Sequence, residues 1–492
     1  MTATGRRARC RACQAAALLA AVLLAGAAAG VAGCARLSPD GGMLAVEAAA
    51  SAELGKEVKK ITSAADAAAV AGRVRALLAK PVTVAAAVEI ALINNRALQA
   101  AFNELGISDA ELAEASLPPS PTLSWQRLVG SGFEIERQIV QNVLALLTLP
   151  RRRRIAEARF AQAQARAVAT TLGVSAEAAR AFYAVVGAGE AVKSLEEARL
   201  SAESASEVAK QLGETGALSK LDQAREHVFY AEVSGQLASA RLRQRRERER
   251  FIRALGLWGG DTKFSLPAKL AALPRQPIAR ETVEQEAVRR RAELVIARLE
   301  VDILALQLGL TRKTRVINAL EVAGISKTEK DIVPVTGEAD KFRRRGFEVD
   351  FDIPIYDFGE ARLKRAEETY MAAVNRLLAR AVTVRSEARE AYEVYRAAYD
   401  IARHYERDVL PLRRIIAEEA MLNYNAMIRD LFALLAEARA RIAANLQAIE
   451  ARRDFWLAAV DLEAAILGGR GAPEASAPGT PAATVSSGAR DH

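Results

Sequence analysis

Apolar residues recur every three or four positions over most of this chain, which is the spacing of amphipathic helices. Between residues 83 and 117 the pattern continues until Pro118 and Pro119 interrupt it, so a helix is predicted to end there. A second helical pattern begins at the arginine run 151–154 and continues to about Gln211. At ~1.5 Å per residue, about sixty residues form a rod of roughly 90 Å.

A chain reversal is predicted directly after this rod. Gly213 and Gly216 are placed to end one helix, and Ser219 is placed to cap the next, with Asp222 in its first turn. The returning helix is predicted to reach about Trp258. The two elements therefore form a long helical hairpin.

One stretch, GFEVDFDIPIYDFG (346–359), alternates with a period of two instead, which indicates a β-strand. The apolar side chains on one face are Phe347, Val349, Phe351 and Ile353. The acidic side chains on the other face are Glu348, Asp350 and Asp352. A solvated sheet edge would give the same alternation, but an apolar outer face with a polar inner face is also typical of transmembrane barrel strands.

Each half of the chain holds one candidate hairpin, namely 122–129 with 133–140 and 315–325 with about 346–353. Helices too long to cover these hairpins flank both of them. Four strands are too few to close a barrel, and open strand edges are not tolerated in lipid. We therefore expect several copies to build one barrel, with Glu348, Asp350 and Asp352 facing its lumen and favouring cations.

The second half repeats the plan of the first. ALINNRALQAAFNEL (91–105) aligns with AVRRRAELVIARLEV (287–301), and Leu149-Pro150 corresponds to Ile353-Pro354. The predicted organisation is a signal peptide at 1–33, a tether and first helices at 34–80, a first repeat at 81–265, a linker at 266–280, a second repeat at 281–468 and a disordered tail at 469–492.

The N-terminus has the order of a secretory signal peptide: arginines, an apolar run from Ala15 to about Val31, and small residues before Cys34. The alternative is a membrane-spanning helix, because the run is nearly long enough to cross a bilayer. The quartet VAGC resembles a bacterial lipobox, which implies diacylglycerol and N-acyl lipid on Cys34. Cys10 and Cys13 lie in the segment expected to be removed, so the mature chain would have no disulfide and no catalytic thiol.

Composition narrows the choice of function. The net charge of +9 includes the arginines of the leader, and basic residues alternate with glutamates elsewhere, which favours solvated helix faces over a nucleic-acid site. The histidines His227, His404 and His492 have no carboxylate or cysteine at ligand spacing, and no glycine-rich phosphate loop is present. We therefore expect neither a metal cofactor nor an enzyme. The mature part has no further apolar run of membrane-spanning length, so any crossing must be made without helices.

In the order and spacing of its motifs, the mature chain resembles the TolC family of outer-membrane efflux proteins. The resemblance rests on ALINNRALQAAFNELGISDAELAEASLPPSPTLSW, GALSKLD and GFEVDFDIPIYDFGEARLKRAE, together with the acylated N-terminus. It implies a mainly α-helical homotrimer, with a twelve-stranded β-barrel in the outer membrane and a helical coiled-coil barrel in the periplasm. It also implies a periplasmic adaptor and an inner-membrane pump as partners. YNAMIRDLFALLAEARARI and RDFWLA look most like members associated with heavy-metal resistance.

The family closes its periplasmic tip with polar links between helix ends. By this resemblance Asp222 falls on the gate aspartate, and Tyr424 and Arg429 fall on the tyrosine and arginine that bind that turn. The alternative is that all three are ordinary turn residues and solvated charges. Met427 stands where the family often has glycine, and Ala433 and Ala436 replace an acidic ring.

Two functions remain open for such a chain. The first is a passive outer-membrane exit duct, and the second is a lipid-anchored periplasmic coiled-coil adaptor or scaffold without a pore. An adaptor has no need for strands with one apolar face between its helices, so the FEVDFDIP pattern favours the duct.

Overall fold

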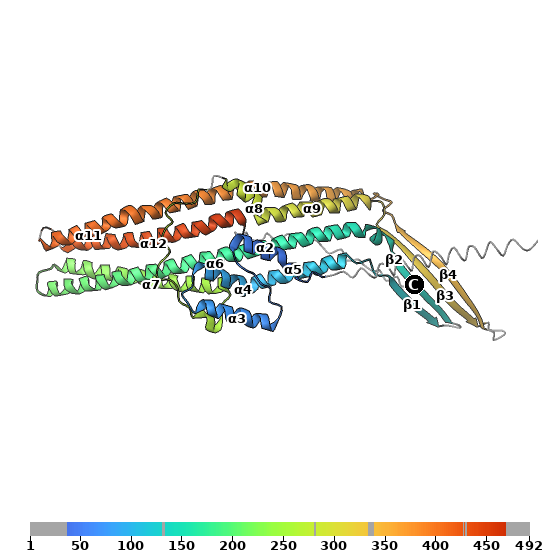
Figure 1. Ribbon diagram of the computed structural model, residues 1–492, viewed down its shortest axis with the longest axis horizontal. Helices are drawn as coiled ribbons and strands as arrows, with labels where there is room; N and C mark the ends of the chain where they lie inside the picture. Colours follow the sequence, from blue (N-terminus) through green and yellow to red (C-terminus); the bar gives the residue numbers. More distant parts are fainter. Residues whose placement is uncertain are drawn as a thin grey trace, which may run out of the picture.

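The computed structural model describes residues 37–129, 133–279, 282–332, 339–426, 428 and 431–468, with only the backbone of residues 331, 332, 339, 340, 431 and 432. It is an elongated helical body with a four-stranded sheet projecting from one end (Figure 1). None of the described helices carries an apolar stretch long enough to cross a membrane.

The first half begins with short helices and ends in a long helical hairpin. Its helices are α2 (Met43–Leu54), α3 (Ala64–Leu78), α4 (Val84–Asn94), α5 (Arg96–Ala115), α6 (Val143–Glu214) and α7 (Lys220–Leu255). The β1 (Thr122–Val129) and β2 (Phe133–Asn142) strands lie between α5 and α6. With 72 residues at ~1.5 Å each, α6 is roughly 110 Å long and runs the length of the body (Figure 1).

The second half has the same order of elements. Its helices are α8 (Val283–Arg290), α9 (Ala292–Lys313), α10 (Glu360–His404), α11 (Leu410–Asn425) and α12 (Leu431–Leu467), with a π-helical turn at Tyr405–Val409. The β3 (Ala319–Ile332) and β4 (Ala339–Asp352) strands lie between α9 and α10. A short 3-10 turn, Gly259–Thr262, opens the connection between the halves.

The two halves share a helix break with the same backbone geometry. Asn95, between α4 and α5, has φ −67° and ψ 119°, and Arg291, between α8 and α9, has φ −63° and ψ 119°. Each side chain then binds the end of the last long helix of its own half. Asn95 Nδ2 donates to the Ala254 carbonyl at 3.1 Å, and Arg291 Nη1 donates to the Ala465 carbonyl at 3.2 Å. These bonds satisfy carbonyls that lack partners at a helix C-terminus.

Two apolar clusters in the middle of the body hold the halves together. Phe182, Tyr183 and Phe251 belong to one cluster, and Phe455 belongs to the other. Trp456 joins them, because its ring stacks on Tyr183 at 5.2 Å between centroids and contacts Phe455 at 5.1 Å. Aromatic pairs of this kind are worth ~1 kcal/mol beyond the area that they bury.

Two sequence-based boundaries were wrong. The second hairpin extends much further from the body than 315–325 and 346–353, because charged residues replace the apolar alternation in its outer half. Helix α6 begins at Val143, so Pro150 and Arg151–Arg154 lie within it rather than at its start. Pro150 is the eighth residue of α6, past the first amides that have no intrahelical acceptor, so the helix lacks one backbone hydrogen bond there. Asn142 Oδ1 accepts from the Ala145 amide at 2.7 Å and caps the helix, which begins seven residues before the proline.

Gly359, where β4 joins α10, is a position that only glycine fits. Its φ is 72°, and a Cβ atom there would collide with the backbone oxygen of Arg315. Gly359→Ala is expected to lower the free energy of unfolding by about 3 kcal/mol, from the left-handed conformation and the steric clash together. Gly309→Ala is the control, because Gly309 lies inside α9 with open space around it and should gain ~0.5–1 kcal/mol of helix stability. Thermal melts followed by circular dichroism would measure both, and equal melting temperatures would contradict this account of the joint.

Candidate functional site

The sheet has the order β1-β2-β3-β4, and all its pairs are antiparallel. The two hairpins, nearly two hundred residues apart in sequence, are joined by β2 and β3. Val140 lies opposite Ala323, and Ala323 lies opposite Glu348, which sets the register across the sheet. Both outer strands, β1 and β4, have a partner on one side only within the described chain.

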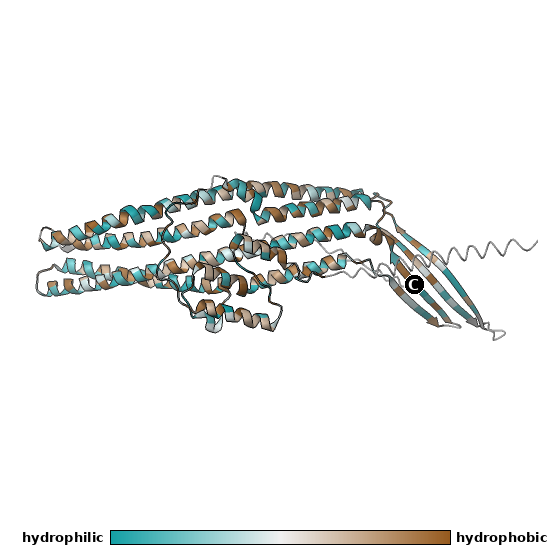
Figure 2. Ribbon diagram, in the orientation of Figure 1, coloured by the Kyte–Doolittle hydropathy of each residue, from teal (hydrophilic) through white to brown (hydrophobic). Residues whose placement is uncertain are grey.

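The register gives each face of the sheet its own chemistry. We call the face that bears Glu348 the carboxylate face and the opposite one the apolar face. The acidic residues on the carboxylate face are Glu134, Glu136, Glu321, Glu329, Glu348, Asp350 and Asp352, and its basic residues are Lys327 and Arg344. Near the helical body the apolar face bears Leu123, Ile139, Leu320, Val322, Phe347, Val349 and Phe351. Teal and brown alternate along the strands accordingly (Figure 2).

On the inner strands β2 and β3 the carboxylate face is the more sheltered of the two, whereas on the outer strands β1 and β4 both faces are exposed. Ala323, in the middle of that face, is 1% exposed, whereas its neighbour Val322 on the apolar face is 37% exposed and Phe347 is 82% exposed. Glu321 lies opposite Asp350 and also accepts from Asn142 Nδ2 at 3.3 Å. The structure thus brings Glu348, Asp350 and Asp352 onto one face with further carboxylates of β2 and β3, a grouping that sequence alternation in β4 alone did not reveal.

Helices α7 and α11 both have their turn ends at the end of the body far from the sheet (Figure 1). Asp222 is in the first turn of α7, where Ser219 Oγ donates to its carboxylate at 2.6 Å and Arg225 Nη1 donates at 3.1 Å. Tyr424 is in the last turn of α11 and is partly exposed. No hydrogen bond joins Asp222 to Tyr424 within the described residues. Arg429 and Cys34 lie outside the described residues.

A buried ion pair near this end was missed in the sequence. The Glu226 side chain on α7 is 2% exposed, and Arg439 of α12 donates to it at 3.1 Å. The Arg439 guanidinium also lies over the Phe229 ring, 4.2 Å from its centroid. This contact links the helical hairpins of the two halves, and its residues are more than two hundred positions apart, so no local pattern could have paired them.

Removing the Arg439 side chain should destabilise the protein. Arg439→Ala would leave the Glu226 carboxylate buried without a partner, and we expect the free energy of unfolding to fall by about 2–3 kcal/mol. Arg243→Ala is the matched control, because Arg243 on α7 pairs with Glu450 on α12 at 3.1 Å with both side chains exposed. Such a pair contributes only ~0–1 kcal/mol. Chemical denaturation would measure the free energy of unfolding of both variants. Equal losses would show that the Glu226–Arg439 pair stabilises the protein no more than an exposed pair.

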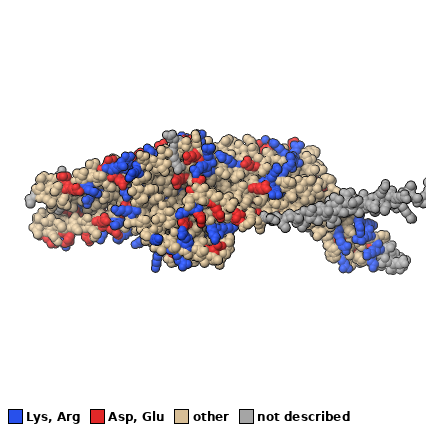
Figure 3. Space-filling model, viewed as in Figure 1, with Lys and Arg blue, Asp and Glu red and all other residues tan. Residues whose placement is uncertain are grey.

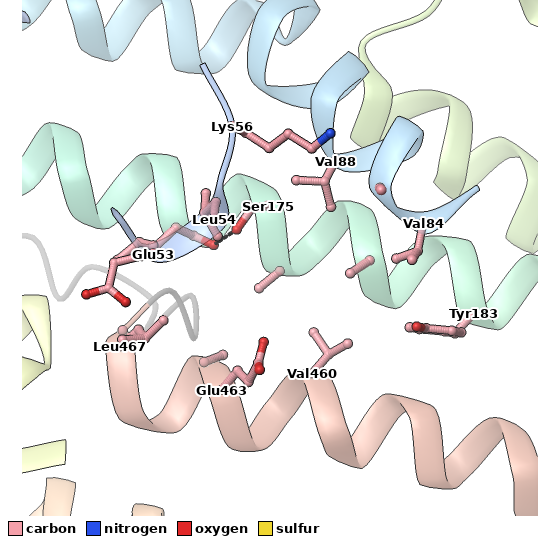
Figure 4. Close-up of a pocket in the computed structure, with 16 residues that line it drawn as sticks. Glu53, Leu54, Lys56, Val84, Val88, Ser175, Tyr183, Val460, Glu463 and Leu467 are labelled. Atoms are coloured by element: carbon pink, nitrogen blue, oxygen red, sulfur yellow. Dashed lines mark hydrogen bonds between the residues drawn. The ribbon is translucent and has the colours of Figure 1, made fainter. Parts of the chain in front are cut away.

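A cavity of about 330 Å³ lies between α6, α12 and the N-terminal helices (Figure 4). Tyr183, Val460 and Glu463 line it, together with Val84 and Val88 of α4. Burial raises the pKa of the Tyr183 phenol, and the nearby Glu463 carboxylate raises it further. The cavity therefore holds a neutral phenol at physiological pH and has a largely apolar wall.

Comparison with known proteins shows where this architecture occurs. No protein-family model matches the sequence, and no curated protein matches it. Among solved structures, VceC of Vibrio cholerae matches 78% of this chain and 96% of its own, with 13% identity and a TM-score of 0.64. The CmeC outer membrane channel of Campylobacter jejuni matches the same share of this chain and 86% of its own, with 17% identity and a TM-score of 0.63.

The chain has the fold of the TolC-type outer-membrane channels. The open-state structure of the MtrE outer membrane channel of Neisseria gonorrhoeae also shares it, at 14% identity over 78% of this chain and 88% of its own, with a TM-score of 0.59. The predicted fold class, mainly helical with a four-stranded contribution per chain, is confirmed. In this chain the two chemically distinct faces and the two open edges coincide in the sheet.

Proposed function

We propose that this protein is a subunit of an outer-membrane exit duct in a tripartite efflux system. Three copies would each give four strands to a twelve-stranded barrel, and their helical bodies would form the tunnel in the periplasm. A periplasmic adaptor and an inner-membrane pump would deliver the substrate. The duct carries out no chemistry, so the protein is not an enzyme.

The observation that carries the proposal is the open sheet with segregated faces. Two unpaired edges cannot remain open in a bilayer, and an apolar face beside a carboxylate face matches the outside and inside of a transmembrane barrel. Pairing β4 of one copy with β1 of the next, again antiparallel, removes both edges. The similarity to solved outer membrane channels supports the same function, because those proteins share the fold over most of their length.

Exposed apolar residues on the helices support assembly of several copies. They follow α10 and α11 on the outside of the single chain, at Leu378, Val382, Val394, Ile401, Leu412, Ile415 and Leu422. Large apolar side chains that recur along one element mark contact surfaces more often than solvated ones. Burial against the helices of neighbouring copies would complete the wall of the tunnel.

Finer features belong to the same proposal. We infer that Cys34 is acylated and anchors the chain in the outer membrane, and that Asp222, Tyr424 and Arg429 form the periplasmic gate. The resemblance of YNAMIRDLFALLAEARARI and RDFWLA to the heavy-metal branch supports metal cations as cargo. A face lined by carboxylates would suit such cargo, because it raises the local concentration of cations.

Cysteine cross-linking between subunits tests the proposal. The mature chain would retain only the acylated Cys34, so an introduced pair has a clean background. Ser124→Cys on β1 would be combined in turn with Arg344→Cys, Gly346→Cys, Glu348→Cys or Asp350→Cys on β4, all on the carboxylate face. A disulfide needs Cα atoms within ~7 Å, so one or two of these registers should give covalent trimers after oxidation.

The control replaces Ser124→Cys with Trp125→Cys, which lies on the other face of the same strand and should not cross-link with those positions. Covalent trimers with the first series alone support a closed barrel. A chain that stays monomeric in every register, after extraction in mild detergent, would instead favour the lipid-anchored adaptor without a pore.

A further inference from the structure

The outer half of the apolar face is mixed. Beyond Phe347 basic side chains enter three successive rows across the sheet, beside apolar ones such as Trp125, Ile135 and Phe133. We call these the basic rows. The basic residues of these rows are Arg127, Arg137, Lys330, Lys341, Arg343 and Arg345. This face bears no acidic residue among the strand positions whose side chains the structure describes. Lys and Arg gather visibly on the sheet in Figure 3.

The three adjacent arginines of β4 show how sharply the charges are sorted. Arg343 and Arg345 point to the apolar face, whereas Arg344 between them lies on the carboxylate face. On the carboxylate face Lys327 forms an ion pair with Glu134. Within the described chain, by contrast, the guanidinium groups of Arg343 and Arg345 have no carboxylate partner. Their charges are left available for a ligand outside the chain.

The basic rows begin where the apolar band ends. From Phe347 on β4 to Ile353, the residue after the strand, the apolar positions extend about 20 Å along the chain at ~3.3 Å per residue. With the ~35–45° tilt of barrel strands this corresponds to roughly 15 Å along the membrane normal. Exposed apolar side chains continue at the base of the sheet with Ile355 at 61% and Tyr356 at 98% exposure. A barrel needs an apolar band ~25 Å tall, bordered by aromatic residues at the interfaces. The ten residues from Phe347 to Tyr356 are about the number that a tilted strand needs to cross the hydrocarbon layer, so we assign this band to that layer.

The basic rows, of which the row of Arg345 is the first, must then lie at the headgroup level of the membrane leaflet that is far from the helical body. Arginine or lysine in the middle of the lipid face of a barrel costs ~2–4 kcal/mol each, and the cost falls to ~0–1 near the interface. When copies close a barrel with Ser124 opposite Gly346, one of the registers tested by cross-linking, Arg127 on β1 of one chain lies opposite Arg343 of the next. The basic rows would therefore form a continuous ring.

We propose that this ring binds the phosphate groups of anionic lipids in the outer leaflet. The proposal rests on the proposed function, because the ring meets lipid only if the sheet is part of a membrane barrel. Guanidinium groups bind phosphate through paired, charge-assisted hydrogen bonds, and arginine is favoured wherever such recognition is needed. The ligand is thus a shell of phosphorylated lipid headgroups held around the barrel.

Trp125 provides a reporter inside the ring. It lies on the apolar face, directly opposite Arg137 and in the same row as Arg345. The two other tryptophans of the chain, Trp258 and Trp456, belong to the helical body. Brominated lipids quench tryptophan fluorescence only on contact. Quenching that disappears in Trp125→Phe therefore reports the lipid beside the basic rows.

The full-length protein would be reconstituted into phosphatidylcholine vesicles containing equal mole fractions of brominated phosphatidylglycerol or brominated phosphatidylcholine. We expect phosphatidylglycerol to bind roughly three- to five-fold more tightly than phosphatidylcholine beside Trp125. One basic residue near a membrane surface raises the affinity for anionic lipid by about this factor. Arg127→Gln/Arg137→Gln should reduce the ratio to about one. Arg343→Gln/Arg345→Gln is a second variant on another strand, expected to lower the ratio as well.

Lys327→Gln/Arg344→Gln is the matched control, because it removes the same charge from the same sheet but on the carboxylate face. It should keep the wild-type preference, and loss of the preference in this control too would overturn the assignment to the basic rows. Equal quenching by both lipids in the wild type would overturn the lipid-phosphate proposal while leaving the barrel intact. Absence of quenching by either lipid would overturn the proposed function as well.

Discussion

Neutralising Glu348, Asp350 and Asp352 together is expected to abolish most of the cation selectivity of the duct that we propose. In a closed barrel these carboxylates would face the lumen three times over, and Glu321, opposite Asp350, would add to their field. Rings of Asp and Glu select cations because they raise the local cation concentration in a narrow passage. Reversal potentials in a salt gradient would compare the wild type with Glu348→Gln/Asp350→Asn/Asp352→Asn.

The control for this experiment uses the opposite face. Arg343→Gln/Arg345→Gln changes charge on the same strand, but on the apolar face, and should leave the reversal potential unchanged. An unchanged reversal potential in the carboxylate variant would mean that these residues do not line the conducting path. A shift of the reversal potential towards higher cation selectivity in the arginine variant would show that the effect comes from net charge rather than from the lumen.

Opening the proposed gate should produce the other large effect. Asp222→Ala/Arg429→Ala is expected to raise single-channel conductance several-fold, because it removes charge-assisted hydrogen bonds that would tie the helix ends together. Within the chain the Asp222 carboxylate already accepts from Ser219 and Arg225. A carboxylate has about four lone-pair sites, so it can accept from a neighbouring subunit as well.

Ser219→Ala separates the gate from local helix capping. It removes the cap of α7 and costs ~1 kcal/mol of local stability but leaves the Asp222 carboxylate in place. If conductance rises equally in Ser219→Ala and in the double variant, fraying of the turn explains the opening, and the assignment of Asp222 and Arg429 as the gate is wrong. A rise confined to the double variant would support the assignment.

Local patterns in the sequence were sufficient for much of the fold. The cap at Ser219 and the reversal after Gly213 follow from turn chemistry, and the structure confirms both. The ends of hairpin β1–β2 were predicted almost correctly, because its strands are short. They are bounded by the turn on one side, and β2 leads directly into α6 on the other. The outer half of β3–β4 was missed since a run such as Lys341 to Arg345 shows no apolar alternation, and strand pairing there depends on the neighbouring strand.

The site was less accessible than the fold. Alternation placed Glu348, Asp350 and Asp352 on one face, but only the pairing of β2 with β3 brings carboxylates of the first half onto that face. The contact between Glu226 and Arg439 depends on how the helical hairpins pack, which no spacing within either helix encodes. The role of Asp222, Tyr424 and Arg429 stays a prediction, because it depends on contacts between copies of the chain.

The most direct test of the central claim is the single-channel conductance of the purified wild-type protein in planar bilayers, recorded together with its mass in mild detergent. A trimer that gives discrete conductance steps, which disappear when both hairpins are deleted, is the result that the duct predicts. A monomer that gives no steps at any voltage would contradict it.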